Sequence, residues 1–287
     1  MQKEAPFVSV LMTAFNRENF IAEAIESVLT SSYTNFELVI VDDCSTDKTF
    51  EIIKHFAAGD QRIRYYQNEK NVGDYPNRNR AAGYAKGDYI AYLDSDDTLM
   101  IDGLKNCIEA MLQFPDVGIG MYWSYSKGVA FCLDGAEAIR QHFFYRQLLV
   151  IGPGGTVLKR SFFEQMKGYP EKYGPANDMY FNLNAACYSE LVLFPFAFSF
   201  YRIHDAQENK NEYSYLYNNY LYQKDALIEL SLPFSFKEKK WLANKNKRRF
   251  LVNIVKYFFK TRDVKQVVKA IRLTNYSLKD TMNGLFH

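Results

Sequence analysis

Residues 89–97, Tyr-Ile-Ala-Tyr-Leu-Asp-Ser-Asp-Asp, join a short apolar run to three carboxylates within four positions. The apolar run is typical of a buried strand, and the carboxylates follow where the chain leaves the core. Folding alone does not favour this arrangement, because crowded like charges repel one another and lose hydration. Mg²⁺ and Mn²⁺ prefer oxygen ligands of this kind and share their remaining positions with substrate phosphates. The stretch therefore predicts a buried strand that ends in a metal–diphosphate site.

The carboxylates also have a structural alternative. Asp96 or Asp97 could cap a helix that begins near Leu99. A helix cap requires only one of the two residues, so the metal site remains the preferred interpretation.

The same alternation of buried strands and helices extends upstream. Strand-like apolar runs cover residues 7–12, 36–41 and 63–67, and helical spacing covers residues 18–29, 46–55 and about 75–85. Strands that are apolar throughout and alternate with helices predict a parallel sheet covered on both faces. In such sheets a ligand binds beyond the carboxyl ends of the strands. We therefore expect Thr13–Asn16, Asp42–Asp43 and Asp94–Asp96 to converge on one crevice.

The rest of the chain contains further elements of both kinds. Strands are expected at 117–122, just after 156 and at 191–201, and helices at 178–188 and after 211; residues 123–150 have no clear pattern. The predicted fold class is α/β, with a Rossmann-like, mostly parallel sheet flanked by helices and a helical C-terminal extension. The expected catalytic domain covers residues 1–210, with a nucleotide-binding half to about 115 and an acceptor half from about 116. The expected extension covers residues 211–287.

Composition excludes several classes of protein. The chain has 287 residues, 48% of them apolar, which is enough for one large core with an appendage. Its four cysteines are far apart and form no Cys-x-x-Cys pair, so neither a disulfide framework nor a zinc site is expected. The N-terminus lacks the apolar core of a signal peptide, and no apolar run is long enough to span a bilayer. The expected location is the cytoplasm.

Charge is distributed unevenly along the chain. Residues 237–287 contain fourteen Lys or Arg and three Asp or Glu, a balance of +11, so residues 1–236 carry −9 of the total of +2. A basic C-terminal segment favours a polyanionic partner, either a membrane surface or a nucleic acid. No nucleic-acid-binding motif is present, so nucleic acid is not expected.

A helical pattern within the basic segment favours the membrane. Six apolar residues are expected to share one helix face flanked by lysines and arginines: Phe250, Leu251, Ile254, Val255, Phe258 and Phe259. Such helices can lie in an anionic membrane interface, here the inner face of the cytoplasmic membrane. The alternative is that this face packs on the catalytic body or on a second subunit.

Four motifs in the first 115 residues carry a family resemblance. They are Val8–Arg17, Val41–Asp47, Asn71-Val72-Gly73 through Arg78-Asn79, and Ala85–Asp97. In their order and spacing they resemble the inverting family-two glycosyltransferases with the A-type fold. The resemblance is weaker between Gly154 and His204 and absent beyond about residue 210. It implies binding of a nucleotide-diphosphate sugar through Mn²⁺ or Mg²⁺.

The resemblance implies a role for each matching residue of the nucleotide site. Thr13 and Phe15 would frame the base, with the Phe15 ring stacked on it, and Ser95 would also belong to the nucleotide site. Asp43 would accept the N3–H of a uracil-like ring, and Arg78 would face the diphosphate or the base. The alternatives are a core position for Phe15, an ordinary turn at Asp42-Asp43, and a solvated helix face for Arg78.

The metal and acceptor sides follow from the same resemblance. Asp94 and Asp96 form the Asp-x-Asp signature, with Asp96 the more direct metal ligand, and His204 would contact the metal or the diphosphate unless it is structural. Gly154 and Gly155 would face the acceptor.

Inversion requires a base that takes the proton of the acceptor hydroxyl. By resemblance this base is Asp178, where Asn177 replaces the usual Glu; the alternative for Asp178 is a helix N-cap.

Together these features predict transfer of one sugar, with inversion, from a uridine-type nucleotide sugar to a glycan or lipid-linked acceptor. The family implies synthesis of a surface polysaccharide such as capsule or lipopolysaccharide. The Gln-x-x-Arg-Trp box of processive synthases is absent, which favours a single transfer. Two alternatives remain: a nucleotidyltransferase, although Thr13-Ala14-Phe15-Asn16 is not its Gly-rich loop, and a non-catalytic module that binds sugar nucleotides.

Overall fold

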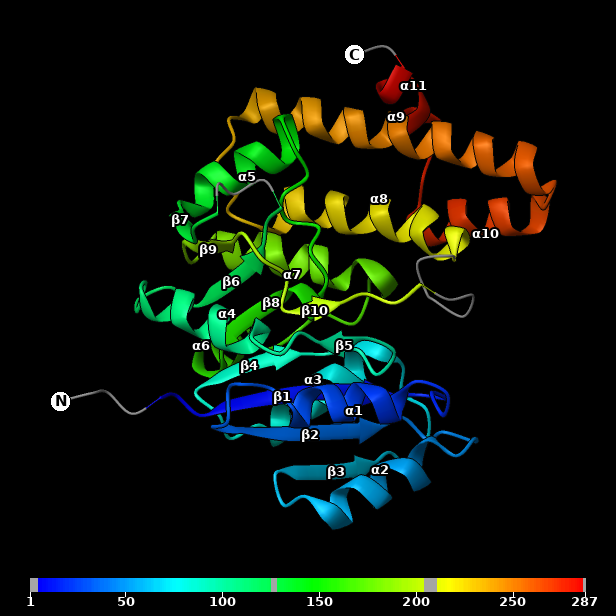
Figure 1. Cartoon of the computed structure of the whole chain (residues 1–287). Helices are drawn as coiled ribbons and strands as arrows, with labels where there is room; N and C mark the ends of the chain where they lie inside the picture. The colour runs from blue at the N-terminus through cyan, green and yellow to red at the C-terminus, as the bar shows by residue number, and fades with distance from the viewer. Residues whose placement is uncertain (1–4, 125–127, 204–210, 286–287) are drawn as a thin grey trace. The chain divides into compact units, whose positions relative to one another are not determined.

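The computed structural model describes residues 5–124, 128–203 and 211–285 (Figure 1). By their internal contacts the residues form two compact units. Unit 1 contains Met1–Gly135, Val150–Tyr169 and Tyr188–Ile203, and unit 2 contains Ala136–Leu149, Pro170–Cys187 and His204–His287. Two short segments that precede residue 210 thus belong with the C-terminal helices. The functional division at residue 210 stays a prediction.

Unit 1 is built on a mostly parallel sheet. Its strands are β1 (Val8–Ala14), β2 (Phe36–Asp42), β3 (Ile63–Gln67), β4 (Tyr89–Tyr92), β6 (Ile119–Tyr122), β7 (Phe131–Leu133), β8 (Thr156–Lys159) and β9 (Leu191–Phe194). Their order across the sheet is β3-β2-β1-β4-β8-β6-β9-β7. Strands β1 to β4 are mutually parallel, as are β6 and β9, whereas β8 and β7 are antiparallel to their neighbours. The predicted fold class is therefore confirmed.

Helices cover both faces of this sheet. Those of unit 1 are α1 (Ile21–Leu29), α2 (Thr49–Gly59), α3 (Asp74–Tyr84), α4 (Gly103–Leu112) and α6 (Arg160–Gln165), with a 3₁₀ turn η1 (Pro153–Gly155). Val8, Val10 and Met12 of β1 share one core cluster with residues of α1 and α4. Leu11 between them is equally buried although it points to the opposite face. This two-sided burial is what the unbroken apolar run of β1 predicts.

Two local predictions are wrong. No helix begins near Leu99, because residues Thr98–Leu99 form a strand, β5, and α4 begins at Gly103. The run 191–201 is not one strand, because β9 ends at Phe194 and residues Ser199–Phe200 form β10, which pairs with β5. A pairing between residues 100 positions apart leaves no local pattern in the sequence.

Unit 2 is helical. Its helices are α5 (Gly135–Phe144), α7 (Asn177–Ala186), α8 (Glu212–Glu229), α9 (Phe236–Thr261), α10 (Val264–Thr274) and α11 (Leu278–Leu285), with a 3₁₀ turn η2 (Gly174–Ala176). A capping box of Ser235 and Glu238 starts α9, and Arg262, at a φ of 58°, ends it. The predicted helical C-terminal region is confirmed.

The predicted apolar face of residues 250–259 is divided in the structure. Phe250 and Ile254 are buried in a cluster with side chains of α8 and α10, whereas Val255 and Phe259 are exposed. The core of unit 2 therefore covers only part of the predicted face. Within the described ranges, no helix is both long and apolar enough to cross a membrane.

Candidate active site

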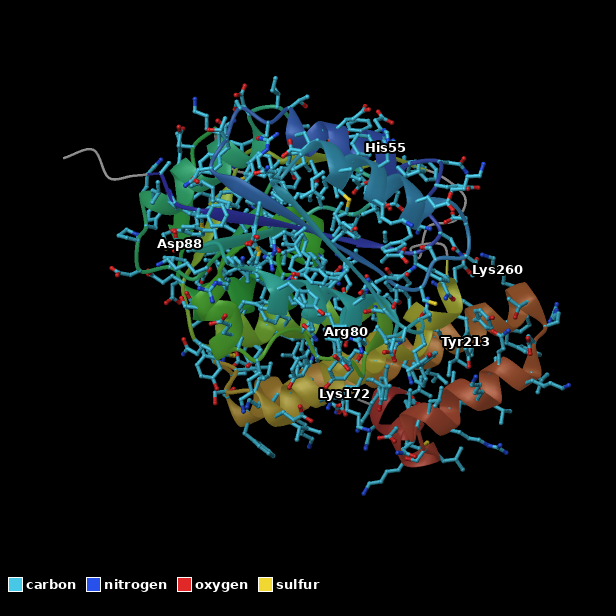
Figure 2. The ribbon with its side chains drawn as sticks, turned by 90° about the horizontal axis from the view of Figure 1, so that it is seen from below. His55, Arg80, Asp88, Lys172, Tyr213 and Lys260 are labelled. Carbon is cyan, nitrogen blue, oxygen red and sulfur yellow. The ribbon has the colours of Figure 1, made fainter. Side chains whose placement is uncertain are left out.

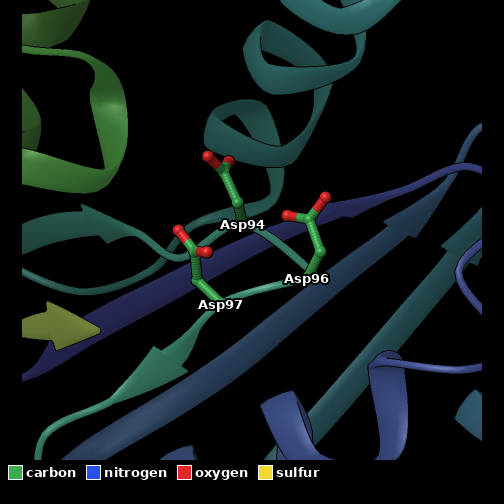
Figure 3. Close-up of side chains that lie close together, drawn as sticks. All are labelled: Asp94, Asp96 and Asp97. Carbon is green, nitrogen blue, oxygen red and sulfur yellow. The ribbon is translucent and has the colours of Figure 1, made fainter. Parts of the chain in front are cut away.

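Three carboxylates meet in the tight turn that follows β4. The Asp97 amide donates to the Asp94 carbonyl at 2.9 Å, and the side chains of Asp94, Asp96 and Asp97 point to the same side of the loop (Figure 3). One oxygen of each lies within 4.8 Å of the others. Because β5 follows directly and α4 begins only at Gly103, neither Asp96 nor Asp97 caps a helix. The cap alternative is wrong.

Three arginines of unit 1 balance this cluster. Arg17 Nε lies 3.0 Å from an Asp96 oxygen, and Arg78 Nη2 lies 2.7 Å from an Asp94 oxygen. The Arg202 amide donates to Asp97 at 3.0 Å, and its guanidinium donates to the Asp96 and Asp97 carbonyls. Arg17 and Arg202 had no role in the sequence-based site. The sequence could have indicated a role for both, because Arg17 ends the motif Val8–Arg17 and Arg202 lies in the weaker match between Gly154 and His204.

Asp97 has a strongly raised pKa. Burial raises its pKa to about 7, opposed by the Arg202 amide and reinforced by the charges of Asp94 and Asp96. The hydrogen bond from Arg202 thus does not compensate for the burial of the Asp97 carboxyl. A hard divalent cation fits these three oxygen donors, and Asp97 joins the predicted ligands Asp94 and Asp96 as a candidate. His204, the other predicted ligand, lies outside the described residues.

Arg78 is buried beside the cluster. Its Nε lies 2.8 Å from Asp74, and the rings of Tyr75 and Tyr92 lie within 5.8 Å of its guanidinium carbon. Burial disfavours its charged form, but Asp74 and Asp94 outweigh burial and raise the Arg78 pKa well above its ordinary value. The alternative of a solvated helix face is wrong for Arg78, whereas Arg80 is exposed.

Two Arg78 nitrogens make no hydrogen bond. Nε and Nη1 are both buried without a hydrogen-bond partner within the described part of the chain, although Nε pairs with Asp74 at 2.8 Å. A buried donor without an acceptor is costly, so Nη1 suits an anionic group brought by a ligand.

Asp43 is held as an acceptor by the 71–73 motif. One of its carboxylate oxygens accepts from Asn68 Nδ2 at 2.7 Å and from the Val72 amide at 2.9 Å, and the other accepts from the Gly73 amide at 2.9 Å. Gly73 has a φ of 92°, a conformation that favours glycine. Asp42 has a structural role instead. Its side chain accepts hydrogen bonds from the Ser45 amide and from Gln67 Nε2 and so stabilises the turn after β2.

Two further loops at these strand ends are tied together in unusual conformations. Asn16 and Cys44 have positive φ values of 52° and 64°. The Asn16 amide donates to Ser45 Oγ, and the Asn16 side chain accepts from the Thr46 amide, both at 2.9 Å. Strained residues of this kind concentrate at functional sites.

These loops carry the remaining predicted nucleotide residues. Thr13 is half-buried and Ser95 is buried. Phe15 is 42% exposed, so the alternative of a core position is wrong and its ring face is accessible for stacking.

The acceptor-side glycines are in unit 1 and differ in what they face. A Cβ built on Gly154 would lie 3.7 Å from an Asp94 oxygen, whereas one on Gly155 would collide with Ile151 at 2.5 Å. Gly154 therefore borders the carboxylate cluster directly, and Gly155 is required by local packing.

Asp178 belongs to unit 2, in the first turn of α7. The N-cap residue is Ala176, so the N-cap alternative for Asp178 is wrong. Asp178 is buried, and one of its oxygens accepts from the Met179 amide at 2.6 Å. Asn177, in place of the usual Glu, accepts from the Tyr173 amide and donates to the Gly174 carbonyl. Asn177 thus holds η2 and the start of α7 together.

Comparison with known proteins agrees with this arrangement. The model of the family described as glycosyl transferase family 2 matches residues 9–166. A putative teichuronic acid biosynthesis glycosyltransferase, TuaG of Bacillus subtilis, is 40% identical over 108 residues, 38% of this chain and 43% of TuaG. The putative glycosyltransferase EpsE of the same organism is 46% identical over 120 residues, 40% of this chain and 43% of EpsE. The chain thus spans less than half the length of these relatives.

Solved structures share the fold at low sequence identity. The S. aureus protein TarS in complex with UDP-GlcNAc matches 92% of this chain and 79% of its own, with a TM-score of 0.73 and 19% identity. The mannosyltransferase PcManGT from Pyrobaculum calidifontis in complex with GDP-Man and Mn²⁺ matches 99% of this chain and 88% of its own, with a TM-score of 0.63 and 15% identity. The predicted glycosyltransferase fold is confirmed.

Proposed function

This chain belongs to glycosyl transferase family 2, and on that premise we propose that it transfers one sugar, with inversion, from a uridine-diphosphate sugar to a glycan or lipid-linked acceptor. The observation that carries the proposal is the cluster of Asp94, Asp96 and Asp97 beside the unsatisfied donor of Arg78. Carboxylates and a buried cationic donor side by side suit a metal ion and a diphosphate bound together.

The carboxylates would hold Mn²⁺ or Mg²⁺. Such an ion neutralises the diphosphate as it leaves and so acts as a Lewis acid. With Asp94 held by such an ion, the Arg78 guanidinium would be available to pair with phosphate oxygens. Arg17 stands in the same relation to Asp96.

Recognition of the base would depend on Asp43. Its second oxygen accepts one hydrogen bond within the described residues, which leaves a lone pair for an N–H donor. Uracil has such a donor at N3 and cytosine does not, so the geometry supports a uridine nucleotide. The exposed Phe15 ring supplies the stacking surface.

Asp178 would act as the general base. The acceptor oxygen attacks the anomeric carbon, its proton passes to the Asp178 carboxylate, and the bond between that carbon and the diphosphate oxygen breaks with both electrons on the diphosphate. A carboxyl group can accept this proton only if it is deprotonated when the reaction starts.

The relatives suggest the pathway. TuaG is named for teichuronic acid biosynthesis, and TarS was solved with UDP-GlcNAc. By analogy with TuaG, we propose that this chain takes part in the synthesis of a surface polysaccharide, at the inner face of the cytoplasmic membrane.

Thermal unfolding with a panel of nucleotides tests the proposal. A UDP-sugar should stabilise the protein in the presence of Mn²⁺ and much less in its absence, because a ligand that binds only the native state raises stability. Stabilisation by a nucleoside triphosphate instead of the UDP-sugar would favour a nucleotidyltransferase. Binding of UDP-sugar without release of UDP in the presence of acceptor glycans would favour a non-catalytic module.

A further inference from the structure

Unit 2 has a mixed basic and apolar surface where α9 meets α10. Four apolar side chains there are between 38% and 62% exposed: Val255, Phe259, Val264 and Val268. Five exposed basic residues lie among them in the sequence, on α9, in the turn that follows it and on α10: Lys256, Arg262, Lys265, Lys269 and Arg272. We call these nine residues the basic–apolar face.

Helix geometry turns this face away from the core of unit 2. On α10, Ala270 and Thr274 are buried, whereas Lys265, Lys269 and Arg272 are exposed on the opposite side. On α9, Ile254 is buried and Phe259 is 62% exposed. The core cluster of α8, α9 and α10 is thus complete without the face.

The charges of the face are not neutralised. Its five cations form no ion pair with a carboxylate within the described ranges, whereas neighbouring Lys247 and Lys260 pair with Asp280 and Glu212. Asp263 is the single acid among residues 255–272, and it is engaged as the N-cap of α10 through the Gln266 amide. The face therefore presents uncompensated positive charge around exposed apolar groups.

A groove with a mixed polar and apolar lining, which includes Leu216, lies at the same end of unit 2. It has a volume of about 330 Å³ and runs between the start of α8 and the end of α9. Its walls include Tyr215, Asn219, Asn253 and Tyr257, and Lys256 belongs to both groove and face. The Glu212–Lys260 pair also lines it, and Figure 2 labels Lys260 and Tyr213 at this end. Amide, hydroxyl and ammonium donors suit the phosphate of a lipid headgroup.

We propose that the basic–apolar face docks on an anionic lipid bilayer. Lysines and arginines near such a surface are attracted to it within a Debye length, and apolar side chains beside them enter the boundary between headgroups and acyl chains. A second copy of the chain fits less well, because two such faces would bring like charges together. A nucleic acid would use the cations and could stack a base on Phe259, but it would leave the three exposed valines without a partner. The inference does not depend on the proposed transfer.

Vesicle sedimentation of the full chain tests it. The chain should bind vesicles that contain phosphatidylglycerol and not vesicles of phosphatidylcholine alone, and high salt should weaken the binding. The variant Lys265→Gln/Lys269→Gln should bind about 30-fold more weakly. The matched control Lys54→Gln/Lys105→Gln removes the same charge from exposed positions of α2 and α4 and should bind within about threefold of the parent.

The apolar contribution is tested separately at high salt. Phe259→Ser should weaken the residual binding about tenfold, whereas Ile101→Ser, at a 63% exposed position of unit 1, should leave it unchanged. Circular dichroism checks that each variant is folded. Equal binding by both lysine double variants would overturn the proposal. So would the absence of binding to anionic vesicles, self-association that Phe259→Ser abolishes, or selective capture of nucleic acid.

Discussion

The strand ends of unit 1 and the helices of unit 2 use their polar residues differently. In unit 1, Asp43 and Asp94 are held by backbone amides and by an arginine in fixed positions. In unit 2, aromatic side chains such as Tyr220 and Phe250 make the contacts, with ring centroids 4.5 Å apart, and most charge is on the exterior. Fixed polar side chains suit recognition of a ligand, whereas apolar packing can be achieved by many sequences.

The stability of each unit can be measured with its own fluorescent residue. The chain has two tryptophans, Trp123 in unit 1 and Trp241 in unit 2. Replacing either with Phe leaves a fluorescent probe in the other unit, so that unfolding of the two units can be measured separately.

The largest effect is expected from the residue of unit 2 with a proposed chemical role. Asp178→Asn should lower turnover by about 10²- to 10⁴-fold, because the amide cannot take the proton of the acceptor. Donor affinity, measured by calorimetry, should be unchanged. Glu171→Gln, an exposed carboxylate that precedes the same helix, serves as control. Turnover of Asp178→Asn close to that of the control, with the fold intact, would remove Asp178 from the mechanism.

Acidification should weaken unit 2 through His142. Burial lowers the pKa of His142 to about 4, with a smaller effect of Arg249, and the Leu149 amide donates to its Nδ1 at 3.1 Å. In the unfolded chain His142 takes up a proton near pH 6.5, whereas in the folded chain it does so only near pH 4. The stability that the neutral, buried His142 provides is therefore present above pH 6.5 and is lost as the pH falls towards 4. The total loss is about 3 kcal/mol of unfolding free energy.

Urea unfolding monitored by Trp241 measures this loss. His142→Asn keeps an acceptor for the Leu149 amide and should remove the slope between pH 6.5 and 4, although it is less stable at neutral pH. A slope identical to that of the parent would show that His142 does not cause it.

Loss of Arg78 should weaken unit 1 by a smaller amount. Arg78→Met leaves Asp94 and Asp74 without their cation and should lower the unfolding free energy by about 2 kcal/mol, since both carboxylates are partly exposed to solvent. Mn²⁺ should restore more stability to this variant than to the parent. Trp123 reports the change, and Lys105→Met, which removes an exposed cation of α4 in the same unit, is the control. Equal losses in the two variants would mean that the cluster does not need Arg78.

The smallest effect concerns the base. The parent should bind UDP about tenfold more tightly than CDP, and Asp43→Asn should reduce this ratio to about one, which corresponds to one hydrogen bond. Competition calorimetry measures the ratio. An unchanged ratio in Asp43→Asn would assign base recognition to another residue.

The same contrast explains what the sequence could predict. The motifs at the strand ends of unit 1 are local, because Asp43, Gly73 and Asp94 each follow a short, regular element. Their convergence follows from the parallel order of β1, β2 and β4. Hence the fold class and the carboxylate cluster could be predicted.

What could not be predicted depends on long-range contacts. The pairing of β5 with β10, the amide of Arg202 on Asp97, and the inclusion of 136–149 in unit 2 join residues distant in the chain. In α9, periodicity alone could not distinguish which of Phe250, Ile254 and Phe259 would be covered by α8 and α10. Burial there is set by partners that have no motif.

The central claim is that Asp94, Asp96 and Asp97 bind a cation together with the nucleotide diphosphate. Calorimetry of UDP binding with and without Mn²⁺ tests it in three proteins: the parent, Asp96→Asn, and Asp116→Asn, which alters an exposed carboxylate of the same unit. We predict that Mn²⁺ increases UDP affinity in the parent and in Asp116→Asn but not in Asp96→Asn. An equal Mn²⁺-dependent gain in all three would contradict the claim.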